Sequence, residues 1–242
     1  MIDVKDKIVL VTGAGRGIGK HFADSFVKSG SIVIGLDKEF CLDRYDFKTL
    51  KIDLTDSKDL LLLIEDIKAS YSKIDVLINC AGITIPSKNT NYSLKDWKKT
   101  LEINLDVPFI LTSACKEMLS RSLNPSVINI GSLNSILAFP NNPAYVSSKT
   151  GLLGLTRALA LDYSCLGIRV NCILPGYIKT DMTGESWTNT SKRNDREKRT
   201  MLGRWGTPED LAGCALFLAS SCSSYITGQS IAIDGGWSIK GL

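Results

Sequence analysis

The stretch KIVLVTGAGRGIGKHFADSFVKSG, residues 7–30, contains an apolar run, a glycine-rich loop and a helical pattern, in that order. The run KIVLVT at 7–12 is short and is followed by glycine, which is typical of a strand buried on both faces of a sheet. Residues 17–29 predict a helix that Gly30 closes. A strand, a tight turn and a helix make the first half of a βαβ unit, so this stretch predicts an α/β fold.

The same alternation continues along the rest of the chain. Further strands are expected at 31–37, 50–54, 74–79, 126–132, 168–174 and 229–234. Helices are expected at 57–71, 95–120, 143–163 and 208–220, with Pro108 as a possible kink in the second of these. Strands that alternate with helices imply a doubly wound parallel sheet of about seven strands, with helices on both faces. No linker or repeat divides residues 1–242, so we expect a single domain.

Composition argues against several classes of protein. The 242 residues are 44% hydrophobic and carry a net charge of only +4, with no long block of like charge, which argues against a nucleic-acid partner. The chain starts straight into a strand and holds no apolar run of membrane-spanning length, so we expect a cytoplasmic protein without a membrane partner. The seven cysteines have no paired spacing, and His21 is the only histidine. We therefore expect no disulfide framework and no metal site, and we expect His21 to pack on its helix.

The glycine-rich loop TGAGRGIG, Thr12 to Gly19, lies where a phosphate-binding turn must be, between a strand and a helix. Gly13, Gly17 and Gly19 allow a tight turn and close approach of the backbone to a pyrophosphate. The helix that follows offers free N–H groups and its positive end to the phosphates. The loop therefore predicts a dinucleotide site in a Rossmann-like domain.

Asp37 lies eighteen residues after Gly19, at the end of the second expected strand. A carboxylate at this position accepts hydrogen bonds from the adenosine ribose hydroxyls and repels a 2′-phosphate, which favours NAD as the cofactor over NADP. Arg16 and Lys38 could each contact a phosphate, however, so NADP stays open as the alternative.

The segment NNPAYVSSKTG, residues 141–151, places Tyr145 and Lys149 four residues apart at the start of an expected helix. Residues at this spacing share a helix face. One interpretation is a pair of surface side chains whose stems cover apolar neighbours. The other is an acid–base pair, in which the ammonium group lowers the pKa of the phenol from its ordinary value of about 10 toward neutrality.

Further motifs occur in order, and together they resemble the short-chain dehydrogenase/reductase family from about residue 5 to the C-terminus. The family's TGxxxGxG is present at 12–19, its NNAG as NCAG at 79–82, its YxxxK at 145–149 and its PG at 175–176. Asn104 in EINL matches the family's helical asparagine, and Ser132 lies thirteen residues before Tyr145, as the family's serine does.

The resemblance implies a role for each matching residue. The catalytic residues would be Asn104, Ser132, Tyr145 and Lys149. Tyr145 would exchange a proton with the substrate, Ser132 would hold the reacting oxygen, and Asn104 would hold a water in a proton relay to Lys149. The cofactor contacts would be Gly13, Arg16, Gly17, Ile18, Gly19, Asp37, Asp53, Leu54, Asn79, Ala81, Gly82, Tyr145, Lys149, Pro175, Gly176, Ile178 and Thr180.

Within that set the resemblance assigns separate parts of the cofactor. Asp53 would hold the adenine ring, and the backbone of Ile18 would donate to the pyrophosphate. Thr180 and the backbone of Ile178 would hold the carboxamide. Cys80 would lie near the cofactor only as a small filler.

The segment after Pro175 is a substrate lid in this family, which we place at about 180–206. Its basic residues either attract an anionic group or form a solvated helix face of mixed charge; they are Lys192, Arg193, Arg196, Lys198 and Arg199. A hydroxyl-rich pocket is one interpretation of a polar group around the cleft, namely Asn134, Asn141, Asn142 and Trp187. PGYIKTDM and GRWGTPEDL look most like the family members that act on sugars and sugar acids.

These observations predict an NAD-dependent oxidoreductase that interconverts a secondary alcohol and a ketone on a sugar, sugar acid or related polyol. Two alternatives lie in the same family: a 3-oxoacyl-(acyl-carrier-protein) reductase using NADPH, and a dihydrodiol dehydrogenase, which the segment GLDKEFCLDRYDF resembles. A third is a non-catalytic dinucleotide sensor. The resemblance also implies a homotetramer, a dimer of dimers, that acts on a small molecule.

Overall fold

The computed structural model of the chain describes residues 2–87 and 91–241. In this part of the chain seven parallel strands form one sheet, in the order β3-β2-β1-β4-β5-β6-β7. The strands are β1 Ile8–Thr12, β2 Ile32–Asp37, β3 Lys48–Lys51, β4 Val76–Asn79, β5 Ser126–Ile130, β6 Arg169–Pro175 and β7 Ser230–Ile233. The predicted single-domain, doubly wound α/β fold is therefore confirmed.

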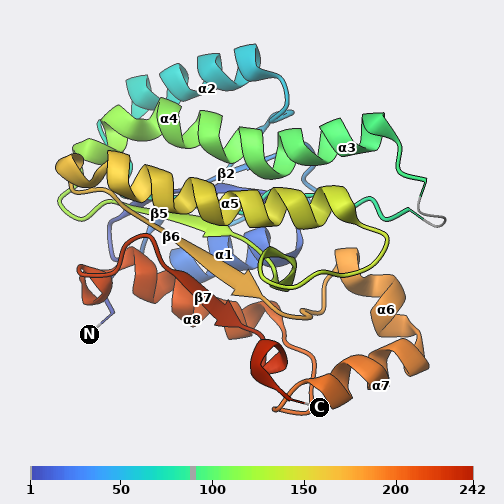
Figure 1. Cartoon of the computed structure of the whole chain (residues 1–242). Coiled ribbons are helices and arrows are strands. Elements are labelled where there is room, and N and C mark those ends of the chain that lie inside the picture. The colour runs from blue at the N-terminus through green and yellow to red at the C-terminus, as the bar shows by residue number, and fades with distance from the viewer. Residues whose placement is uncertain (1, 88–90, 242) are drawn as a thin grey trace.

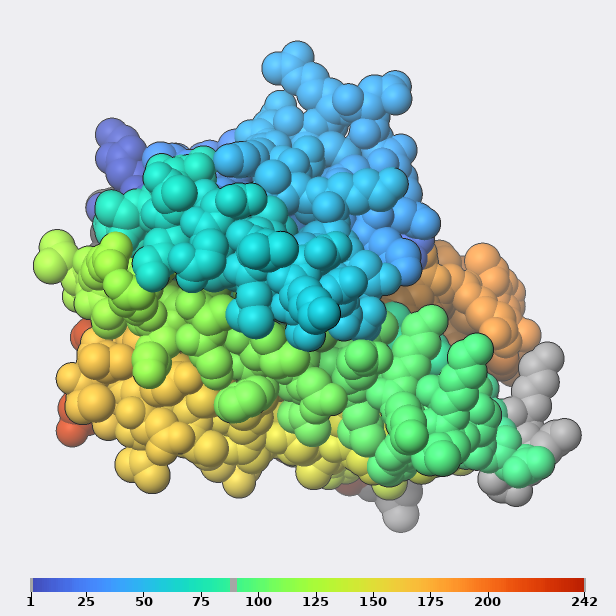
Figure 2. All heavy atoms as spheres, turned by 90° about the horizontal axis from the view of Figure 1, so that it is seen from above, coloured from blue at the N-terminus to red at the C-terminus, as the bar shows by residue number. Residues whose placement is uncertain are grey.

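Helices cover both faces of the sheet (Figure 1). One face carries α2 Ser57–Ser70, α4 Val107–Ser120 and α5 Pro143–Asp162, and the other carries α1 Gly17–Lys28 and α8 Pro208–Ala219. The remaining helices lie toward the carboxyl ends of the strands; they are α3 Leu94–Leu101, α6 Gly184–Thr188 and α7 Thr190–Arg199. Figure 2 shows α2, α4 and α5 side by side, so the sheet is hidden from that side.

The side chains of each strand alternate between two apolar layers, because successive residues of a strand point to opposite faces. Leu10 of β1 packs under α2 and α4, whereas Val9 and Val11 pack against α1 and α8. All three are fully buried. Both faces of the central strands are thus dry, and ligands can approach the sheet only at its edges and strand ends.

Local sequence signals set where the helices begin. Asp56 caps α2 by accepting hydrogen bonds from the backbone N–H groups of Lys58 and Asp59. Ser93 caps α3 by accepting a hydrogen bond from the backbone N–H of Asp96. Pro143 and Pro208 open α5 and α8, where a missing N–H costs no hydrogen bond.

One expected strand boundary was wrong, and one expected helix contains an irregular turn. The third strand ends at Lys51 instead of residue 54, because Asp53 turns the chain out of the sheet by accepting from the backbone N–H of Thr55. The expected helix at 95–120 contains a π-helical turn, Glu102–Asp106, between α3 and α4. Pro108 lies just after it, in the first turn of α4, and it has no N–H to donate to the carbonyl of Asn104.

A chain of buried polar side chains crosses the sheet under α4 and α5. Asn79 donates to Thr112 at 3.1 Å and to Asn129 at 2.8 Å, and Asn129 donates to Thr156 at 2.9 Å. All four side chains are buried, so each hydrogen bond forms without competition from water. The chain therefore fixes how β4 and β5 meet the two helices that carry the site described below.

None of the described helices has both the length and the apolar character needed to cross a membrane.

Replacing Asn129 by Ala should lower the free energy of unfolding by about 2 kcal/mol, because it removes two buried hydrogen bonds and leaves Asn79 and Thr156 partly unsatisfied. Denaturant unfolding followed by circular dichroism measures this change. The matched control is Asn194→Ala on the exposed face of α7, which should change stability by less than about 0.5 kcal/mol. Equal effects of the two substitutions would contradict the role of this chain.

Candidate active site

The expected site residues come together at the carboxyl edge of the sheet. The chain runs outward from β1 to β2 and β3 and then returns to β4 on the other side of β1. This reversal opens a crevice at the strand ends, which is where open α/β sheets bind ligands. The glycine-rich loop after β1 and the NCAG turn after β4 form its two walls.

Thr12 ties these walls together. Its hydroxyl oxygen accepts from the backbone N–H groups of Cys80 and Ala81, each at 3.0 Å. Gly13 has a φ of +69°, and a Cβ there would lie 2.9 Å from the Cα of Ala81. A Cβ on Gly19 would lie 2.2 Å from the carbonyl oxygen of Gly13. The two turns therefore pack so closely that both positions require glycine.

The start of α1 has the properties of a phosphate site. Arg16 takes the N-cap position with extended backbone, and no side chain caps the first N–H groups of the helix. Ile18 lies in the first turn, next to Gly17. A Cβ on Gly17 would be 3.9 Å from the side chain of Thr180, so the segment after β6 passes over this helix end. The free N–H groups and the helix dipole suit an anion between them.

The opposite end of the crevice is built around Asp37. Its carboxylate accepts from the backbone N–H of Gly15 at 2.8 Å and from that of Glu39 at 3.2 Å. Tyr45 donates to the carbonyl oxygen of Gly15 at 2.9 Å, which fixes the loop from its other side. The structure thus places Asp37 beside the glycine-rich loop, as expected.

Asp53 lies next to Asp37 but is already paired. Its carboxylate accepts from Lys38 at 2.7 Å and from the hydroxyl of Thr55 at 2.7 Å. Those hydrogen bonds, the one from Lys38 first, lower the pKa of Asp53 to about 2. A groove of about 740 Å³ runs from Lys38 and Asp53 past Ile83 to α3. This groove has room for a flat ring beside Asp53.

Tyr145 and Lys149 share one face of α5, as their spacing predicts. The Nζ atom of Lys149 lies 5.8 Å from the centroid of the Tyr145 ring and donates to the carbonyl oxygen of Ile130 at 2.7 Å. A Cβ on Gly82 would be 3.4 Å from that Nζ atom and 3.2 Å from Oδ1 of Asn104. Lys149, Asn104 and Gly82 therefore surround one point in the crevice.

Asn104 clamps the turn after β4. Its Oδ1 accepts from the backbone N–H of Ile83, and its Nδ2 donates to the carbonyl oxygen of the same residue, both at 2.9 Å. Nδ2 also donates to Ser148 at 3.1 Å, and Ser148 donates to the carbonyl oxygen of Tyr145. The π-helical turn therefore fixes both the crevice wall and the start of α5.

Ser132 completes the group from the end of β5. Its Oγ accepts from the backbone N–H of Asn134 at 3.2 Å, which caps a short turn. Its side chain also interacts with the Tyr145 hydroxyl, which offsets only part of the rise that burial causes in the pKa of Tyr145. All four expected catalytic side chains are thus brought to one place.

The expected lid segment, 180–206, leaves the sheet and returns to it at one point. Lys179 donates its N–H to the carbonyl of Gly206, and Gly206 donates to the carbonyl of Tyr177, both at 2.9 Å. Between these bonds the chain forms α6 and α7, which lie beyond the carboxyl ends of β6 and β7 (Figure 1).

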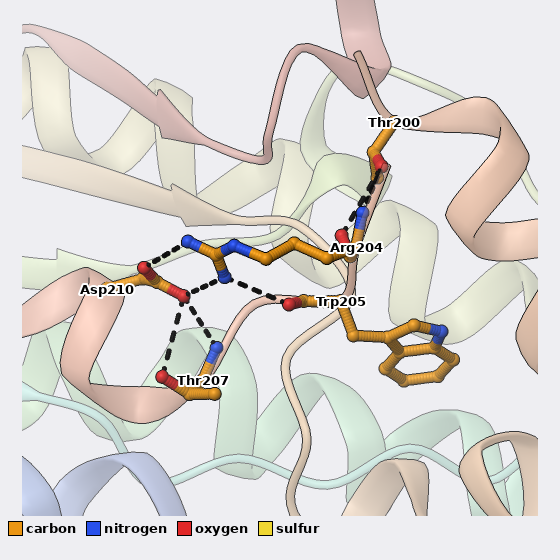
Figure 3. A network of polar contacts seen from close by, with 5 residues as sticks. All are labelled: Thr200, Arg204, Trp205, Thr207 and Asp210. Carbon is orange, nitrogen blue, oxygen red and sulfur yellow. Dashed lines mark hydrogen bonds and ion pairs between the residues drawn. The ribbon is translucent and has the colours of Figure 1, made fainter. Parts of the chain in front are cut away.

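An ion pair holds the base of this segment (Figure 3). Arg204 donates to both carboxylate oxygens of Asp210, at 2.7 and 2.8 Å, and the N–H of Thr207 donates to the same carboxylate. Figure 3 shows the side chains of Arg204 and Trp205 pointing to opposite sides of the chain. Arg204 therefore binds α8 while Trp205 turns toward α6 and α7.

Comparison with known proteins gives consistent matches over the whole chain. A family model described as "Enoyl-(Acyl carrier protein) reductase" matches residues 13–238. The chain is 34% identical to the NAD-dependent glycerol dehydrogenase of Listeria innocua, over 98% of this chain and 96% of the relative. It is 36% identical to the 2-dehydro-3-deoxy-D-gluconate 5-dehydrogenase of Bacillus subtilis (97% and 95%). It is 34% identical to the 3-oxoacyl-(acyl-carrier-protein) reductase of Thermotoga maritima (96% and 98%).

The chain belongs to the short-chain dehydrogenase/reductase family.

Solved structures of the family agree with this assignment. The aldohexose dehydrogenase of Thermoplasma acidophilum superposes with a TM-score of 0.93 at 32% identity, over 98% of this chain and 96% of that chain. A gluconate 5-dehydrogenase from Burkholderia cenocepacia, in complex with NADP and tartrate, superposes with 0.92 at 28% identity, over 99% and 98%. As a member of this family, the protein is an oxidoreductase that acts on CH–OH groups with a nicotinamide cofactor.

The expected electrostatics of this dehydrogenase/reductase need one correction. Burial raises the pKa of Tyr145, and the hydrogen bond with Ser132 opposes that rise only in part. Burial also lowers the pKa of Lys149. The expectation that Lys149 brings the phenol pKa down was therefore wrong for this structure, because the apolar surroundings of both groups disfavour both charged forms.

Several expected contacts of the family site are limited to the backbone. The side chain of Asn79 is committed to Thr112 and Asn129, and those of Leu54 and Ile178 are buried in the apolar layers. Pro175 ends β6, and Gly176 lies so close to Asp234 that a Cβ would be 2.7 Å from its Cα. Leu54 and Ile178 can therefore reach a cofactor only through backbone atoms, whereas only Nδ2 of Asn79 is paired and its Oδ1 is buried without a hydrogen-bond partner among the described residues.

His21 was expected to pack on its helix and Cys80 to act only as a small filler. His21 lies on α1 with Nδ1 3.4 Å from a carboxylate oxygen of Glu209 on α8. Burial raises the pKa of the Cys80 thiol to about 12, so it stays protonated and unreactive.

Some residues around the site were not singled out from the sequence. Ser148 directly precedes Lys149, and no motif of its own marked it. Thr84 lies two residues after the NCAG turn and accepts a hydrogen bond from Asn142 at 2.6 Å. Tyr177 follows Pro175-Gly176 directly, and that position was the available signal. Its importance depends on ring neighbours from distant parts of the chain.

Replacing Asp210 by Ala should free the base of segment 180–206, since Arg204 loses both carboxylate acceptors and keeps only the carbonyl oxygen of Trp205, and Thr207 loses its partner. Trypsin should then cut the basic part of α7 several times faster, and the melting temperature should fall by a few degrees. Asp195→Ala, which removes an exposed carboxylate from α7, is the control. Unchanged cleavage of the Asp210 variant would contradict the role of this ion pair.

The pH dependence of this ion pair follows from Asp210. The hydrogen bond from Arg204 holds the pKa of that carboxyl well below its usual range. Its stabilising effect is therefore fully present above the unfolded pKa of about 4 and is lost only as the pH falls toward the depressed folded value.

Proposed function

We propose that this protein is an NAD-dependent oxidoreductase that interconverts a secondary alcohol and a ketone on a sugar acid or a related polyol. The observation that carries the proposal is the convergence of Asn104, Ser132, Tyr145 and Lys149 beside the phosphate-binding loop. The similarity to deoxygluconate and gluconate dehydrogenases supports the substrate class. Polar side chains near Ser132 and Tyr145, among them Asn134 and Asn142, suit a substrate with several hydroxyl groups.

The residues present fit a nicotinamide dinucleotide. The uncapped N–H groups of α1 suit a pyrophosphate, and the carboxylate of Asp37 suits ribose hydroxyls. At Gly82 a Cβ would fill the space in front of Lys149 and Asn104, so the missing side chain leaves a cradle open there. Thr180 would hold the carboxamide, and Lys149 would hydrogen-bond the second ribose.

The proposed chemistry assigns one task to each side chain. The bound nicotinamide supplies the hydride acceptor in oxidation and the hydride donor in reduction. The Tyr145 hydroxyl gives its proton to the ketone oxygen in reduction and takes the alcohol proton in oxidation. Ser132 donates to the same substrate oxygen and stabilises the charge that grows there.

Burial of Tyr145 decides whether reduction or oxidation can start from the protonation state that this residue has at rest. Since the pKa of Tyr145 is raised, its phenol is protonated and is ready to act as the acid in reduction. Oxidation needs that proton to leave first, and the neighbouring Lys149 and the clamp at Asn104 lie where a relay to solvent would start. Oxidation should therefore be favoured by higher pH.

Replacing Tyr145 by Phe should reduce turnover by at least about a hundredfold, because the group that exchanges the proton is lost while the ring still fills its site. Absorbance of reduced nicotinamide, followed with NAD and a panel of sugar acids and polyols, measures this loss. Binding of NADH, followed by its fluorescence, should stay within about twofold.

Tyr163→Phe at the other end of α5 provides the matched control and should remain fully active. Full activity of the Tyr145 variant would refute the catalytic role. A wild-type protein that binds NADH but oxidises no member of the panel would favour the non-catalytic sensor.

The proposed preference for NAD rests on the carboxylate of Asp37 and on the ion pair between its neighbour Lys38 and Asp53. Asp37 stays fixed by two backbone N–H groups at the place where a 2′-phosphate would sit. Lys38 could neutralise such a phosphate, but its ammonium group is held by Asp53 at 2.7 Å. Asp53 therefore supports the discrimination indirectly, by keeping Lys38 away from the ribose.

Replacing Asp53 by Asn should shift the ratio of kcat/KM for NADP over NAD upward by about three- to tenfold, because Lys38 is released. The same substitution in a Lys38→Ala background should leave the ratio unchanged, which separates the release of Lys38 from a direct contact of Asp53 with the adenine. Steady-state rates with both cofactors measure the ratio. An equal shift in the two backgrounds would show that Lys38 is not involved.

A second candidate function is the reduction of a 3-oxoacyl group on acyl carrier protein. The 34% identity to the Thermotoga maritima reductase supports it. Asp37 argues against this function, because the alternative considered from the sequence is a reductase that uses NADPH. A carboxylate at Asp37 would repel the 2′-phosphate of that cofactor. Rates with acetoacetyl thioesters and NADPH, set beside those with sugar acids and NAD, decide between the two functions.

A further inference from the structure

Five aromatic rings form a continuous cluster under α6 and α7, which we call the aromatic wall. Neighbouring ring centroids lie between 4.9 and 6.4 Å apart. The wall consists of Phe139, Tyr177, Trp187, Trp205 and Trp237. These rings come from five positions spread between residues 139 and 237, so only the folded protein brings them together.

Four cations lie against this wall. Lys179 is 4.3 Å from the ring centroid of Trp187, and Arg193 is 5.4 Å from the same ring. Arg196 lies 4.8 Å from the ring of Tyr177, and Arg199 lies 5.6 Å from that of Trp237. The three arginines are spaced three residues apart on α7, so they occupy one side of that helix.

The basic residues of α7 divide into two sets. Lys192 pairs with Glu185 at 2.8 Å, and Lys198 is exposed. In contrast, the described part of the chain places no carboxylate within ion-pairing distance of Lys179, Arg193, Arg196 or Arg199. The Nε atom of Arg196 is buried and has no hydrogen-bond acceptor among the described residues. The solvated-face interpretation therefore suits Lys192 and Lys198 but not Arg196.

The wall adjoins the catalytic group. Phe139 belongs to the loop between Ser132 and Tyr145, and its ring centroid is 6.3 Å from that of Tyr177. Tyr177 follows the end of β6, three residues before Thr180, which lies over the start of α1. Arg193 accepts a hydrogen bond from the indole of Trp205 on its carbonyl oxygen, at 3.2 Å. The aromatic wall thus links the arginine side of α7 to the loop between Ser132 and Tyr145.

We propose that Arg196, with Arg193, Arg199 and Lys179 around it, forms a subsite for the anionic end of the substrate. The proposal deepens the proposed function and rests on it. An arginine that lies against an aromatic ring can still donate to a carboxylate or phosphate from an N–H group that the protein leaves without an acceptor, as it leaves Nε of Arg196. The apolar rings exclude water beside it, which strengthens such a charged hydrogen bond.

This subsite predicts a substrate with two different ends. One end of the substrate carries hydroxyl groups that would lie beside Ser132 and Tyr145. The other end carries an oxyanion group that would lie beside Arg196. A polyhydroxy carboxylate has that form, and so does a sugar phosphate. A neutral polyol lacks the second end and would gain nothing from Arg196.

The test compares substrates with and without an anionic end. Initial rates of NAD reduction would be measured with gluconate, glucose 6-phosphate and sorbitol, for the wild type, Arg196→Met, Arg196→Lys and Lys198→Met. Methionine keeps an unbranched apolar chain over Tyr177, and Lys198→Met removes the same charge from the exposed side of α7.

Arg196→Met should raise KM for the anionic substrate about tenfold or more, with kcat changed by less than about threefold and KM for sorbitol unchanged. Arg196→Lys should restore part of the loss, and Lys198→Met should behave as the wild type. Whether gluconate or glucose 6-phosphate shows the effect identifies the oxyanion as carboxylate or phosphate. An equal rise for sorbitol, or no rise at all, would overturn the subsite.

A direct binding measurement separates this proposal from the proposed function. Trp187, Trp205 and Trp237 report on the wall, so their fluorescence would be titrated with the same three compounds at constant ionic strength. A saturable change with an anionic compound, absent with sorbitol and lost in Arg196→Met, supports the subsite even if the wild type oxidises none of them. The absence of any anion-specific change would overturn it.

Discussion

The hydrogen bonds from Cys80 and Ala81 to the hydroxyl of Thr12 hold the turn after β1 against the turn after β4. All later features of the site depend on this contact, because the two turns lie on either side of the point where the strand order reverses. Gly13 permits the close approach, and Gly82 leaves the space in front of Lys149 open. A single hydroxyl group thus sets the width of the crevice.

The polar groups around the crevice are held by partners in the core of the protein. Asn104 clamps Ile83, and Lys149 donates to the carbonyl of Ile130, so neither side chain is free to turn away. Such buried polar groups cost free energy unless every hydrogen bond is made. The π-helical turn before Pro108 supports the arrangement, since it brings Asn104 to the crevice without breaking the path from α3 to α4.

The two ends of the crevice are built differently. The proposed cofactor end is made of backbone groups and short acids on tight turns after strands, so its geometry is fixed by the sheet. The proposed substrate end is made of long cations and aromatic rings outside the sheet, held at their base by the bridge at Gly206 and by Arg204 with Asp210. A family can therefore keep one reaction and change its substrate by altering the second end alone.

The sequence by itself determined the alternation of strands and helices, the glycine-rich loop, Asp37 and the spacing of Tyr145 and Lys149, because each of these signals is local or periodic. It placed the third strand two to three residues too late along the chain, and it did not reveal the π-helical turn before Pro108, whose Asn104 contacts Ile83 and Ser148 from other parts of the chain. Only the tertiary structure decided the pKa directions of Tyr145 and Lys149, because burial depends on the whole fold. The same holds for α7: its sequence shows five basic residues, and only the folded structure places its three arginines beside the rings of residues 177, 187 and 237.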